Sequence, residues 1–576
     1  MDKDTLLKID NLSIGFYDDN EINLAVKNVS FELQRGRIMG IVGESGSGKT
    51  VTSLSVMKLL PEKASKVLSG NIRFNISGKP EINLINCTEK QMQDIRGHYI
   101  GMIFQEPMSS LNPVIKCGKQ VAESLLIHKI CDKKYVKSKV IELFNEVKLP
   151  DPMRIYNSYP HQLSGGQRQR VMIAMAISCK PSLLIADEPT TALDVTVQNS
   201  ILLLIKELQK KYNMSVLFIT HDLGVVVDIA DDVLIMYKGE VVESGKTKMV
   251  FENPQHPYTS GLIRCRPSLK ERPAKLAVVS DFLEKNIVKQ EHKNSNYEVL
   301  LQQRKMQHDK IYSKPPILTV ENLKTQFVTK RGFFGKALKH HNAIDNIAFR
   351  VFEGETLGLV GESGCGKTTL GRTLLKLIDP TEGKIIYKGI DLSKLKHSEM
   401  RKFRPKIQII FQDPYASLTP GISIGDAILE PMKVHRMHNT DKERKLKVIE
   451  LLEKVGLEEI HYKKYPHEFS GGQRQRVCIA RALALEPEFV VCDESVSSLD
   501  VSVQAQVLNL LNQLKEDFGL TYIFISHDLS VVKYMSDRIM VMKDGKIIEL
   551  EEADKLYENP ASAYTRQLID SIPGIA

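Results

Sequence analysis

Several features that mark whole classes of protein are missing from this chain. No stretch approaches the roughly 18–20 consecutive apolar residues that a membrane-spanning helix needs. The opening residues, MDKDTLLKID, lack the apolar core of a signal peptide. The 8 cysteines show no CxxC spacing, which indicates free thiols in a reducing compartment. We therefore expect a cytoplasmic chain. If it works at a membrane, other subunits must supply the membrane spans.

The charge of the chain carries little information about its partners. The net charge is +9, but lysines and arginines are scattered along the sequence, so solvated surfaces explain most of them. The rest of the composition is ordinary for a globular protein, with 42% hydrophobic residues, which excludes disorder throughout. A length of 576 residues is too great for one hydrophobic core and indicates two to four domains.

What the chain does contain is one set of motifs that is present twice, in the same order. Two copies indicate two domains and two equivalent sites. Each copy carries a glycine-rich loop, a motif with Ser-Gly-Gly-Gln, an acidic motif and a histidine motif. In the first half these are GESGSGKT (Gly43–Thr50), LSGGQRQRV (Leu163–Val171), ADEPTTALD (Ala186–Asp194) and THD (Thr220–Asp222). In the second half they are GESGCGKT (Gly361–Thr368), FSGGQRQRV (Phe469–Val477), CDESVSSLD (Cys492–Asp500) and SHD (Ser526–Asp528).

The repeat also sets the expected domain boundaries. We expect a first domain over residues 1–265, a linker over 266–315 and a second domain over 316–576. The linker is rich in Lys, Glu and Gln, and Pro315-Pro316 ends any helix before the second domain begins. We interpret it as a tether, with a small appended interaction segment as the alternative.

The glycine-rich loops have the surroundings that a P-loop needs. Each follows an apolar run, IMGIV or TLGLV, and precedes helix-compatible sequence, which predicts a strand–loop–helix unit. Glycines allow backbone N–H groups to point at phosphates, and the helix N-terminus adds partial positive charge. Lys49 and Lys367 are then expected to reach the β- and γ-phosphates of a nucleotide. Thr50 and Thr368 are expected to place a hydroxyl on Mg²⁺.

Each acidic motif places an Asp-Glu pair at the end of an apolar run that predicts a buried strand. Asp187 and Asp493 are expected to bind Mg²⁺. Glu188 and Glu494 lie one residue further on, at the carboxyl end of a strand, where α/β sheets place their ligands. A carboxylate there can polarise the water that attacks the γ-phosphate. The alternative is that both carboxylates cap the next helix, which suits one such pair better than two pairs that each accompany a P-loop.

The Ser-Gly-Gly-Gln motif narrows the class of nucleotide-binding protein. Ser164 and Ser470 each come directly before helix-compatible sequence. A serine N-cap followed by two glycines leaves N–H groups at a helix start, which makes a second anion site. Because each half already has its own phosphate loop, the extra site makes physical sense if it closes on a nucleotide bound by another domain.

With these motifs the chain resembles the ATP-binding-cassette (ABC) ATPases over Leu6–Gly261 and Ile317–Ile569. The resemblance implies an α/β fold of two tandem P-loop ABC-type nucleotide-binding domains. Each would have a RecA-like α/β core, an antiparallel β subdomain and an α-helical subdomain. It also implies that the halves form an intramolecular head-to-tail dimer, in which the Ser-Gly-Gly-Gln motif of one half covers the ATP on the P-loop of the other.

The resemblance assigns roles to further residues. Gln105 and Gln412 resemble the Q-loop glutamine, which senses Mg²⁺ and the transporter partner. His221 and His527 match the switch histidine that contacts the γ-phosphate. These four residues and the two glutamates form the expected catalytic set. The expected Mg²⁺ ligands are Thr50, Gln105 and Asp187 in the first half and Thr368, Gln412 and Asp493 in the second.

The expected nucleotide-binding set covers the P-loops, the signature motifs and the D-loop aspartates. Phe16 or Tyr17, and Phe327, are candidates to stack on adenine. The expected set in the first half is Gly43, Glu44, Ser45, Gly46, Ser47, Gly48, Lys49, Thr50, Ser164, Gly165, Gly166, Gln167 and Asp194. In the second half it is Gly361, Glu362, Ser363, Gly364, Cys365, Gly366, Lys367, Thr368, Thr369, Ser470, Gly471, Gly472, Gln473 and Asp500.

The segments after each Q-loop and at the end of each half narrow the family further. IFQEPMSSLNP (Ile103–Pro113) and IFQDPYASLTP (Ile410–Pro420) resemble the dipeptide/oligopeptide/nickel importer group. VFENPQHPYTSGLI (Val250–Ile263) and LYENPASAYTRQLI (Leu556–Ile569) resemble its C-terminal signature. The resemblance implies a fused pair of ATPase subunits, peripheral at the cytoplasmic face of the inner membrane. They would use ATP to drive two transmembrane permeases, with an extracytoplasmic solute-binding protein that delivers the solute.

Several points stay open in the sequence. A peptide, a nickel chelate, glutathione or another small solute fits the resemblance. The alternative function is a soluble twin-cassette ABC ATPase that acts on ribosomes or RNA, whereas the importer needs no nucleic acid. Some relatives carry a cysteine cluster for an iron–sulfur centre in the tail. This chain has only Cys265 there, so we expect no cluster. Cys365 lies in the second P-loop at a helix N-terminus, which is expected to favour its thiolate.

Overall fold

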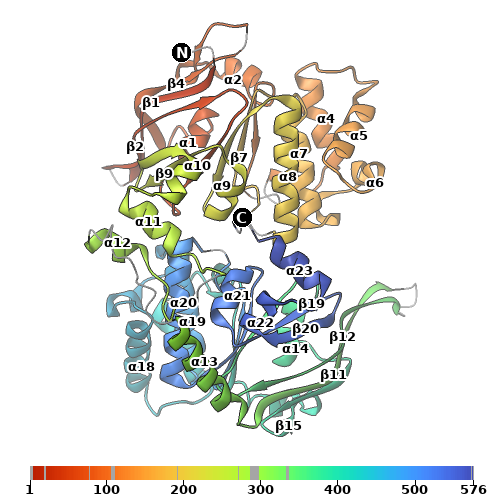
Figure 1. The fold of residues 1–576 in the computed structure, drawn as a ribbon, viewed down its shortest axis with the longest axis vertical. Helices are drawn as coiled ribbons and strands as arrows, with labels where there is room; N and C mark the ends of the chain where they lie inside the picture. The colour runs from red at the N-terminus through yellow and green to blue at the C-terminus, as the bar shows by residue number, and fades with distance from the viewer. Residues whose placement is uncertain are drawn as a thin grey trace. The chain divides into compact units, whose positions relative to one another are not determined.

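The computed structural model describes residues 4–18, 21–76, 78–105, 110–190, 193–269, 272–285, 297–331, 337–497, 499–572 and 574 (Figure 1). The chain forms two compact units, which we describe one at a time. The first unit comprises Met1–Ile263, Val279–Val288 and Pro573–Ala576, and the second comprises Arg264–Val278 and Lys289–Ile572. Each unit contains one copy of the repeated motifs.

The central sheet of the first unit has six strands in the order β10-β9-β3-β8-β7-β6, and only the β10–β9 pair is antiparallel. A second sheet, with the order β2-β1-β4-β5, is antiparallel throughout. The strands of this unit are β1 (Thr5–Asp18), β2 (Glu21–Gln34), β3 (Ile38–Val42), β4 (Ser65–Phe74), β5 (Ile82–Asn83), β6 (Ile100–Ile103), β7 (Leu183–Asp187), β8 (Ser215–Thr220), β9 (Asp232–Tyr237) and β10 (Glu240–Lys246).

Side chains of β8 alternate between two hydrophobic cores, one on each face of the central sheet. Val216 and Phe218 belong to a core shared with the helices that follow β6, and Leu217 and Ile219 belong to a core shared with the antiparallel sheet. Because both faces are covered, the central strands read as continuous apolar runs rather than alternating ones.

The helices of the first unit pack on the central sheet, and those that follow β6 form a group of their own. Helices α4, α5 and α6 contact one another, and α4 and α5 contact α7. The helices are α1 (Lys49–Val56), α2 (Glu89–Ile95), α4 (Cys117–Ile127), α5 (Val136–Glu146), α6 (Pro152–Asn157), α7 (Gly165–Ile177), α8 (Val195–Tyr212), α9 (Leu223–Ile229), α10 (Thr247–Glu252), α11 (Pro257–Arg264) and α12 (Val279–Lys285).

The second unit repeats this architecture. Its central sheet has the order β16-β17-β18-β13-β19-β20, with β20 antiparallel to β19, and its antiparallel sheet has the order β12-β11-β14-β15. The strands are β11 (Pro316–Arg331), β12 (Ala337–Phe352), β13 (Thr356–Val360), β14 (Glu382–Tyr387), β15 (Ile390–Asp391), β16 (Ile407–Ile410), β17 (Phe489–Asp493), β18 (Thr521–Ile525), β19 (Arg538–Lys543) and β20 (Lys546–Glu552).

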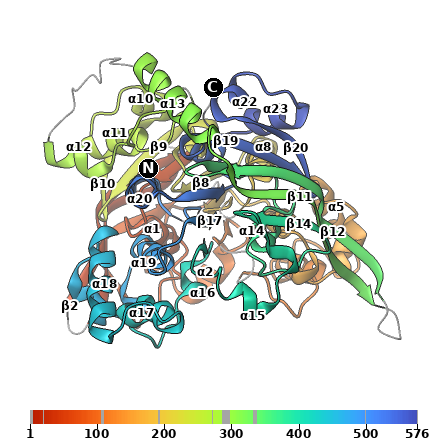
Figure 2. The same ribbon diagram turned by 90° about the horizontal axis from the view of Figure 1, so that it is seen from below.

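Helices α17, α18 and α19 contact one another and lie on the opposite side of β17 from the antiparallel strands β11, β12 and β14 (Figure 2). The helices of this unit are α13 (Tyr297–Tyr312), α14 (Lys367–Leu374), α15 (His397–Met400), α16 (Pro414–Ser417), α17 (Ile424–Val434), α18 (Asp441–Lys454), α19 (Gly471–Leu483), α20 (Val501–Phe518), α21 (Leu529–Met535), α22 (Ala553–Glu558) and α23 (Ala563–Asp570). Each unit therefore has the α/β core, the antiparallel β sheet and the helical group that the family resemblance implies.

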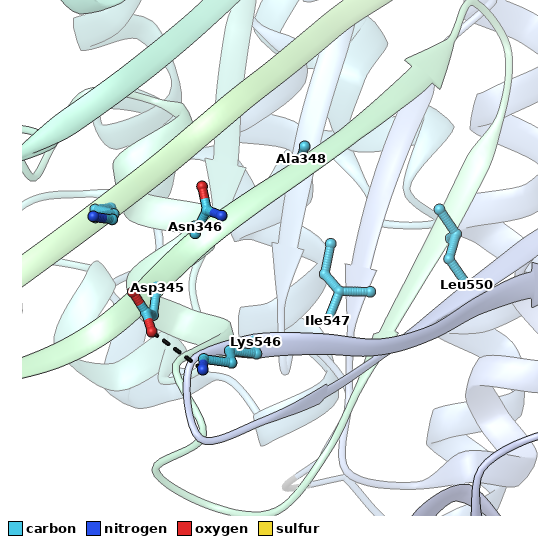
Figure 3. A pocket seen from close by; sticks show the side chains of 7 residues that line it. Asp345, Asn346, Ala348, Lys546, Ile547 and Leu550 are labelled. Carbon is cyan, nitrogen blue, oxygen red and sulfur yellow. Dashed lines mark ion pairs between the residues drawn. The ribbon is translucent and has the colours of Figure 1, made fainter.

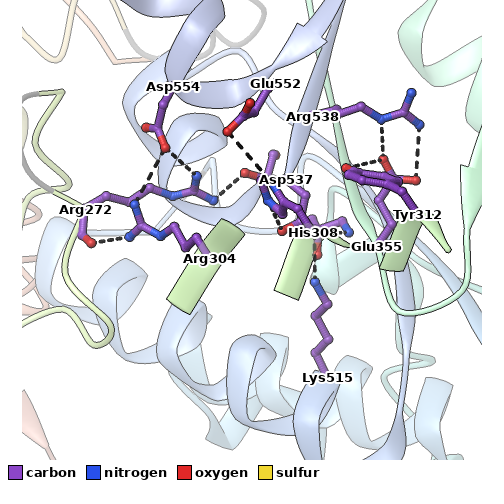
Figure 4. Close-up of polar contacts among 12 residues, drawn as sticks. Arg272, Arg304, His308, Tyr312, Glu355, Lys515, Asp537, Arg538, Glu552 and Asp554 are labelled. Atoms are coloured by element: carbon purple, nitrogen blue, oxygen red, sulfur yellow. Dashed lines mark hydrogen bonds and ion pairs between the residues drawn. The ribbon is translucent and has the colours of Figure 1, made fainter. Parts of the chain in front are cut away.

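The segment between the two cassettes makes specific contacts within the second unit (Figure 4). The Arg272 guanidinium donates from Nε to the carbonyl oxygen of Tyr534 at 3.1 Å and also donates to the carbonyl of Ser536. It forms an ion pair with Asp554 at 3.6 Å. On α13, His308 Nε2 lies 3.3 Å from a carboxylate oxygen of Asp537. Residues 270–271 and 286–296 of the expected linker lie outside the described residues.

Two sequence expectations on bulk features can be compared with the structure. No helix in the described part of the chain is long and apolar enough to cross a membrane. All 8 cysteines lie in the described ranges and are free thiols, as their spacing predicts.

Candidate nucleotide sites

Each P-loop joins a buried strand to a helix. Strand β3 leads into the loop before α1, and β13 leads into the loop before α14, and all five residues of each strand are buried. Gly48 has φ +97°, and a Cβ there would lie 2.7 Å from the carbonyl oxygen of Ala25 on β2. Only glycine fits this left-handed position against neighbouring backbone. Gly366, at φ +107°, is held in the same way by Ala343 on β12.

The two P-loop lysines bond to their own loops. Lys49 Nζ donates to the carbonyl oxygens of Gly43 at 2.7 Å and Glu44 at 2.8 Å. Lys367 Nζ donates to those of Gly361 at 2.7 Å and Glu362 at 3.0 Å. Both ammonium groups are almost completely buried, so each loop presents a positive charge that carbonyl dipoles orient.

The P-loop threonines reach the aspartates at the ends of β7 and β17. Thr50 Oγ1 donates to Asp187 Oδ1 at 3.2 Å, and Thr368 Oγ1 donates to Asp493 Oδ1 at 3.0 Å. The other carboxylate oxygen of Asp493, Oδ2, is buried and has no hydrogen-bond partner among the described residues. Burial, and then the neighbouring Glu188, raise the pKa of Asp187 to about 6. A buried hydroxyl–carboxylate pair with an unsatisfied acceptor fits a hard cation such as Mg²⁺.

The glutamates that follow these aspartates are held in strained backbone. Glu188 has φ +46° and Glu494 has φ +48°, which are left-handed values that cost energy for a residue with a Cβ. The Glu188 N–H donates to Ile219 O on β8 at 2.9 Å. The strain persists because the surrounding contacts determine the position of each carboxylate.

A glutamine and a histidine meet each glutamate. In the first cassette Gln105 Nε2 donates to Glu188 Oε2 at 2.9 Å, and His221 Nδ1 lies 3.1 Å from Oε1. In the second cassette Gln412 Nε2 donates to Glu494 at 2.7 Å, and His527 Nδ1 lies 3.7 Å from the same carboxylate. The structure therefore brings together the glutamine, glutamate and histidine that the sequence assigns to one site.

In the second cassette the glutamate and the histidine shift each other's pKa in opposite directions. Burial alone would raise the pKa of Glu494, but the hydrogen bond and charge of His527, with smaller contributions from Lys367 and Gln412, lower it overall. Burial would lower the pKa of His527, and the same pair raises it overall. The Glu494 carboxylate is thereby kept ionised, which is the form that a general base needs.

The signature motifs begin α7 and α19. Ser164 Oγ accepts from the N–H of Gln167 at 3.3 Å, while Gln167 Oε1 accepts from the Ser164 N–H at 3.2 Å, which forms a capping box. Ser470 and Gln473 form the same box. The glycines serve packing as well as anion binding, because a Cβ on Gly166 would lie 2.8 Å from Val197 of α8. Gly472 meets Val503 of α20 in the same way.

The D-loop aspartates begin the helices that pack on these glycines. Asp194 is the N-cap of α8 and accepts from the Val197 N–H at 2.9 Å, and Asp500 is the N-cap of α20. Residues 191–192 and 498 of the acidic motifs, and 106–109 after the first Q-loop glutamine, lie outside the described residues.

The adenine candidates lie on the antiparallel sheets. Tyr17 on β1 is 53% exposed and Phe327 on β11 is 42% exposed, whereas Phe16 is partly buried. Phe16 pairs with Asn23 of β2, two residues before the Ala25 that touches the P-loop, and Phe327 pairs with His341, two residues before Ala343. All three aromatics therefore lie close to Ala25 or Ala343, the strand residues that contact the P-loops.

The thiol of Cys365 differs from expectation. Its side chain is only 6% exposed, and burial raises its pKa even though Lys367 Nζ, 3.9 Å from the sulfur, works in the opposite direction. The expectation of a favoured thiolate is therefore wrong, because desolvation outweighs the positive charge at the helix start.

Sequence reasoning missed two tyrosines in the C-terminal tails. Tyr258 Oη accepts from the Glu44 N–H at 3.1 Å, and Tyr564 Oη accepts from the Glu362 N–H at 3.2 Å. Both bonds end on a P-loop. The available signal was that a Tyr-Thr pair recurs at the same place in both tails, which a single tail would not reveal.

Figure 3 shows a pocket on the second unit. It lies between β12 and β20, where Asp345 and Lys546 form an ion pair at 3.5 Å. Its lining contains no residue from the P-loop, the acidic motif or the signature motif. The chemical groups described above, rather than this pocket, remain the candidates for the nucleotide site.

Comparisons with known proteins decide the family. The ABC transporter model matches residues 26–191 and 344–497, which is more than half of the chain. A model described as the oligopeptide/dipeptide transporter C-terminal region matches residues 242–282 and 548–576. The chain belongs to the ABC transporter family. It is an ATP-binding, ATP-hydrolysing subunit of the peptide-importer type, with two cassettes in one chain.

Relatives share the fused arrangement along the whole chain. The glutathione import ATP-binding protein GsiA of Escherichia coli K12 and that of Salmonella choleraesuis are each 45% identical over 578 residues, which covers 100% of this chain and 90% of each relative. A solved dimeric ATP-binding cassette, MJ0796 bound to ADP and Pi, is 30% identical, with a TM-score of 0.37, and the match covers 41% of this chain and 98% of that one. The two full-length relatives and the two family models support the importer function over the ribosome or RNA alternative.

Proposed function

We propose that this ABC importer subunit powers the uptake of glutathione or a closely related small peptide. It would do so by hydrolysing ATP at two sites that are shared between its cassettes. The relatives named for glutathione import match the chain over its full length, which supports this cargo over a nickel chelate. The observation that carries the catalytic part is the glutamine–glutamate–histidine group beside each P-loop.

The proposed arrangement is a head-to-tail dimer of cassettes within one chain. The signature helix of each half already has a capped N-terminus, and its own cassette already has a P-loop. ATP on Lys49 would be covered by Ser470–Gln473, and ATP on Lys367 by Ser164–Gln167. Each half would then supply the anion site that the other half's nucleotide lacks.

The residues of each site suggest how hydrolysis is achieved. Lys49 and Lys367, released from their loop carbonyls, would bind the β- and γ-phosphates. Glu188 and Glu494 would accept a proton from the attacking water, and Gln105 and Gln412 would hold these carboxylates in place. The histidines His221 and His527 would contact the γ-phosphate and report its loss.

The metal set is part of the proposal. Thr50, Gln105 and Asp187 in the first cassette, and Thr368, Gln412 and Asp493 in the second, would hold Mg²⁺. When bound, the ion offsets the negative charge of the phosphates. A bound cation would lower the pKa of Asp187, which burial and the neighbouring Glu188 otherwise raise.

The partners follow from the importer type. We infer that two transmembrane permeases contact the helical groups α4–α6 and α17–α18, and that an extracytoplasmic binding protein delivers the solute. The chain would then be peripheral at the cytoplasmic face of the inner membrane, where hydrolysis would reopen cassettes that ATP binding had closed. We expect the chain to co-purify with two multispanning proteins and to show no RNase-sensitive association with ribosomes.

The test removes the two candidate bases together. In the double variant Glu188→Gln and Glu494→Gln, ATP should still bind, because the P-loops are intact, while steady-state hydrolysis should fall to background. Cells that carry this variant should also lose uptake of labelled glutathione. Undiminished turnover would refute the assignment of the glutamates. Lost turnover with unchanged glutathione uptake would refute the cargo.

A further inference from the structure

The tail of each cassette reaches back to its P-loop through a tyrosine. In the first unit, Tyr258 is the second residue of α11, and its side chain is completely buried. Its ring lies 4.2 Å, centroid to centroid, from the ring of Tyr237 at the end of β9. The Tyr258 hydroxyl accepts from the backbone N–H of Glu44, the second residue of the loop, at 3.1 Å.

The second unit repeats the hydrogen bond with different packing. Tyr564 of α23 accepts from the Glu362 N–H at 3.2 Å. No tyrosine occupies the end of β19. There, Lys543 Nζ lies 4.5 Å from the centre of the Tyr564 ring. The ring environment has changed between the copies and the hydroxyl contact has not, so the hydroxyl is the shared feature.

A glutamate on the edge strand anchors each tail. Glu243 of β10 accepts from the N–H of Gln255 at 2.9 Å and of His256 at 3.0 Å, just before α11. In the second unit, Glu549 of β20 accepts from the N–H of Ala561 at 2.9 Å and of Ser562 at 3.1 Å. A carboxylate that receives two backbone N–H groups fixes where the following helix starts. The tyrosine is thereby held in place from the far edge of the central sheet.

We propose that the C-terminal tail of each cassette is part of its nucleotide site, with Tyr258 and Tyr564 as positioning residues for the P-loop. A loop that must aim several N–H groups at phosphates gains from being fixed before ATP arrives, because less conformational freedom is then lost on binding. The tyrosine hydroxyl also accepts a backbone N–H of a partly buried loop, where hydrogen bonds to backbone groups count most. This role rests on the proposed function of the P-loops, but the contact itself does not.

The experiment uses Tyr258→Phe and Tyr564→Phe in the full chain. Each removes one hydroxyl and keeps the ring that fills the buried space. Amide hydrogen exchange of the ATP-free protein, read by mass spectrometry, should become about threefold to tenfold faster in the P-loop peptide of the altered cassette. The P-loop of the other cassette in the same molecule is the internal control and should not change. Tyr135→Phe removes an exposed hydroxyl on the helical group and should change neither loop.

Steady-state kinetics provide a second measurement. The KM for ATP should rise by about threefold to tenfold in each variant. The kcat should stay within about twofold, because the glutamate and histidine contacts are untouched. A purely structural role would accelerate exchange over the whole unit without a selective rise in KM, and that result would overturn the proposal. So would unchanged P-loop exchange. If the wild-type chain showed no ATPase activity, the proposed function would fail, while the exchange data would still decide whether the tail fixes the loop.

Discussion

The two cassettes hold their glutamates in nearly the same way but support the strand before the P-loop differently. Asp231 Oδ2 accepts from the Ile38 N–H at the start of β3, and Asp537 Oδ2 accepts from the Thr356 N–H at the start of β13, both at 2.8 Å. Asp231 is exposed, whereas Asp537 is only 8% exposed. The same backbone contact is therefore made by an exposed aspartate in one cassette and by a buried aspartate in the other.

The difference comes from the segment between the cassettes. In the second unit, His308 of α13 and Lys515 of α20 both approach Asp537, at 3.3 Å and 3.1 Å (Figure 4). At the position of Lys515 the first cassette has Gln209, which donates to Gly36 O instead. The glutamine, glutamate and histidine contacts are thus repeated, while the second cassette has incorporated part of the chain that joins it to the first.

The helices that follow the two histidines, α9 and α21, also have the same position but different supporting contacts. In the first cassette Lys206 of α8 donates to Asp228 O near the end of α9. The equivalent helix α21 offers Tyr534 O to Arg272, and the residue equivalent to Lys206 is Asn512. One cassette uses its own lysine, and the other uses an arginine from outside the repeated domain. Copies of a domain can therefore keep their chemistry while they exchange the source of their supporting contacts.

The largest expected effect tests whether the chemistry is truly the same in both copies. Glu188→Gln and Glu494→Gln, made singly, should each lower single-turnover ATP cleavage at the altered site by at least about 100-fold, because each removes the candidate general base of that site. We expect the two factors to agree within about threefold, given the matched contacts. Asp379→Asn, at an exposed carboxylate that follows α14, is the control and should leave the rate unchanged. A large loss in one variant only would show that the sites are not equivalent.

A smaller effect should distinguish Asp231 from Asp537, the two aspartates that bond to the strands before the P-loops, by the cost of their loss in free energy of unfolding. Asp537→Asn leaves the largely buried side chain of Lys515 beside a neutral group, so the free energy of unfolding of the second unit should fall by about 3 kcal/mol. Asp231→Asn removes the charge of an exposed residue from one backbone hydrogen bond and should cost about 1 kcal/mol in the first unit. Urea-dependent hydrogen exchange of peptides from β13 and β3 measures both. Equal costs would contradict the difference in burial.

The pH dependence of the second unit follows from the same carboxylate. Burial would raise the pKa of Asp537, but Lys515, then His308 and the Thr356 N–H, lower it overall. The stabilisation is therefore complete above the usual aspartate pKa and is lost as the pH falls through the lower folded-state value. Acid titration should remove part of the stability difference between wild type and Asp537→Asn. A difference that grew on acidification would have the wrong sign.

The capping contacts should have local effects of about 1–2 kcal/mol. Arg272→Met should speed amide exchange in α21 and leave α9 unchanged, and Lys206→Met should do the reverse. Lys305→Met, on the exposed face of α13, is the matched control for Arg272. If Arg272→Met changed both helices equally, the segment between the cassettes would not be a specific support of the second one.

The smallest effect concerns Glu488, before β17. Burial opposes its ionisation, but bonds from Lys388, Tyr387 and Lys406 lower its pKa to about 2. The equivalent Ser182 carries no charge. Because Glu488 is 33% exposed, Glu488→Gln should cost the second unit about 1 kcal/mol or less at pH 7. That cost should vanish as the pH falls from the ordinary value of 4.5 towards 2, and Ser182→Ala should show no such pH dependence.

The sequence was sufficient for the parts that repeat. P-loops, acidic pairs and signature motifs are short, contiguous and tied to strand ends or helix starts, so their elements could be predicted from local pattern. The glutamine–glutamate–histidine groups needed the family resemblance, because Gln105, Glu188 and His221 are far apart in the chain. The contacts of Arg272 could not be predicted, because its carbonyl acceptors lie more than 250 positions away and leave no residue-type signal.

Burial explains the remaining differences. Cys365 has the charge surroundings that favour a thiolate, and only the structure shows that desolvation prevails. Tyr258 and Tyr564 were visible as residues of the tail, but their hydroxyls bond to backbone groups, which carry no side-chain signature. The segment between the cassettes was interpreted from its polar composition as a tether. Buried ion pairs can involve just such polar residues.

The sharing of each nucleotide site between the two halves is tested most directly by cross-linking. Cysteines at Ser164 and Ser363 should form an intramolecular cross-link with a short bifunctional reagent when ATP is bound to the Glu188→Gln, Glu494→Gln chain. Cysteines at Ser164 and Ser45, which lie in the same cassette and are equally exposed, should not. Efficient cross-linking of the first pair alone is the predicted result. Cross-linking of the second pair, or of neither, would contradict the shared sites.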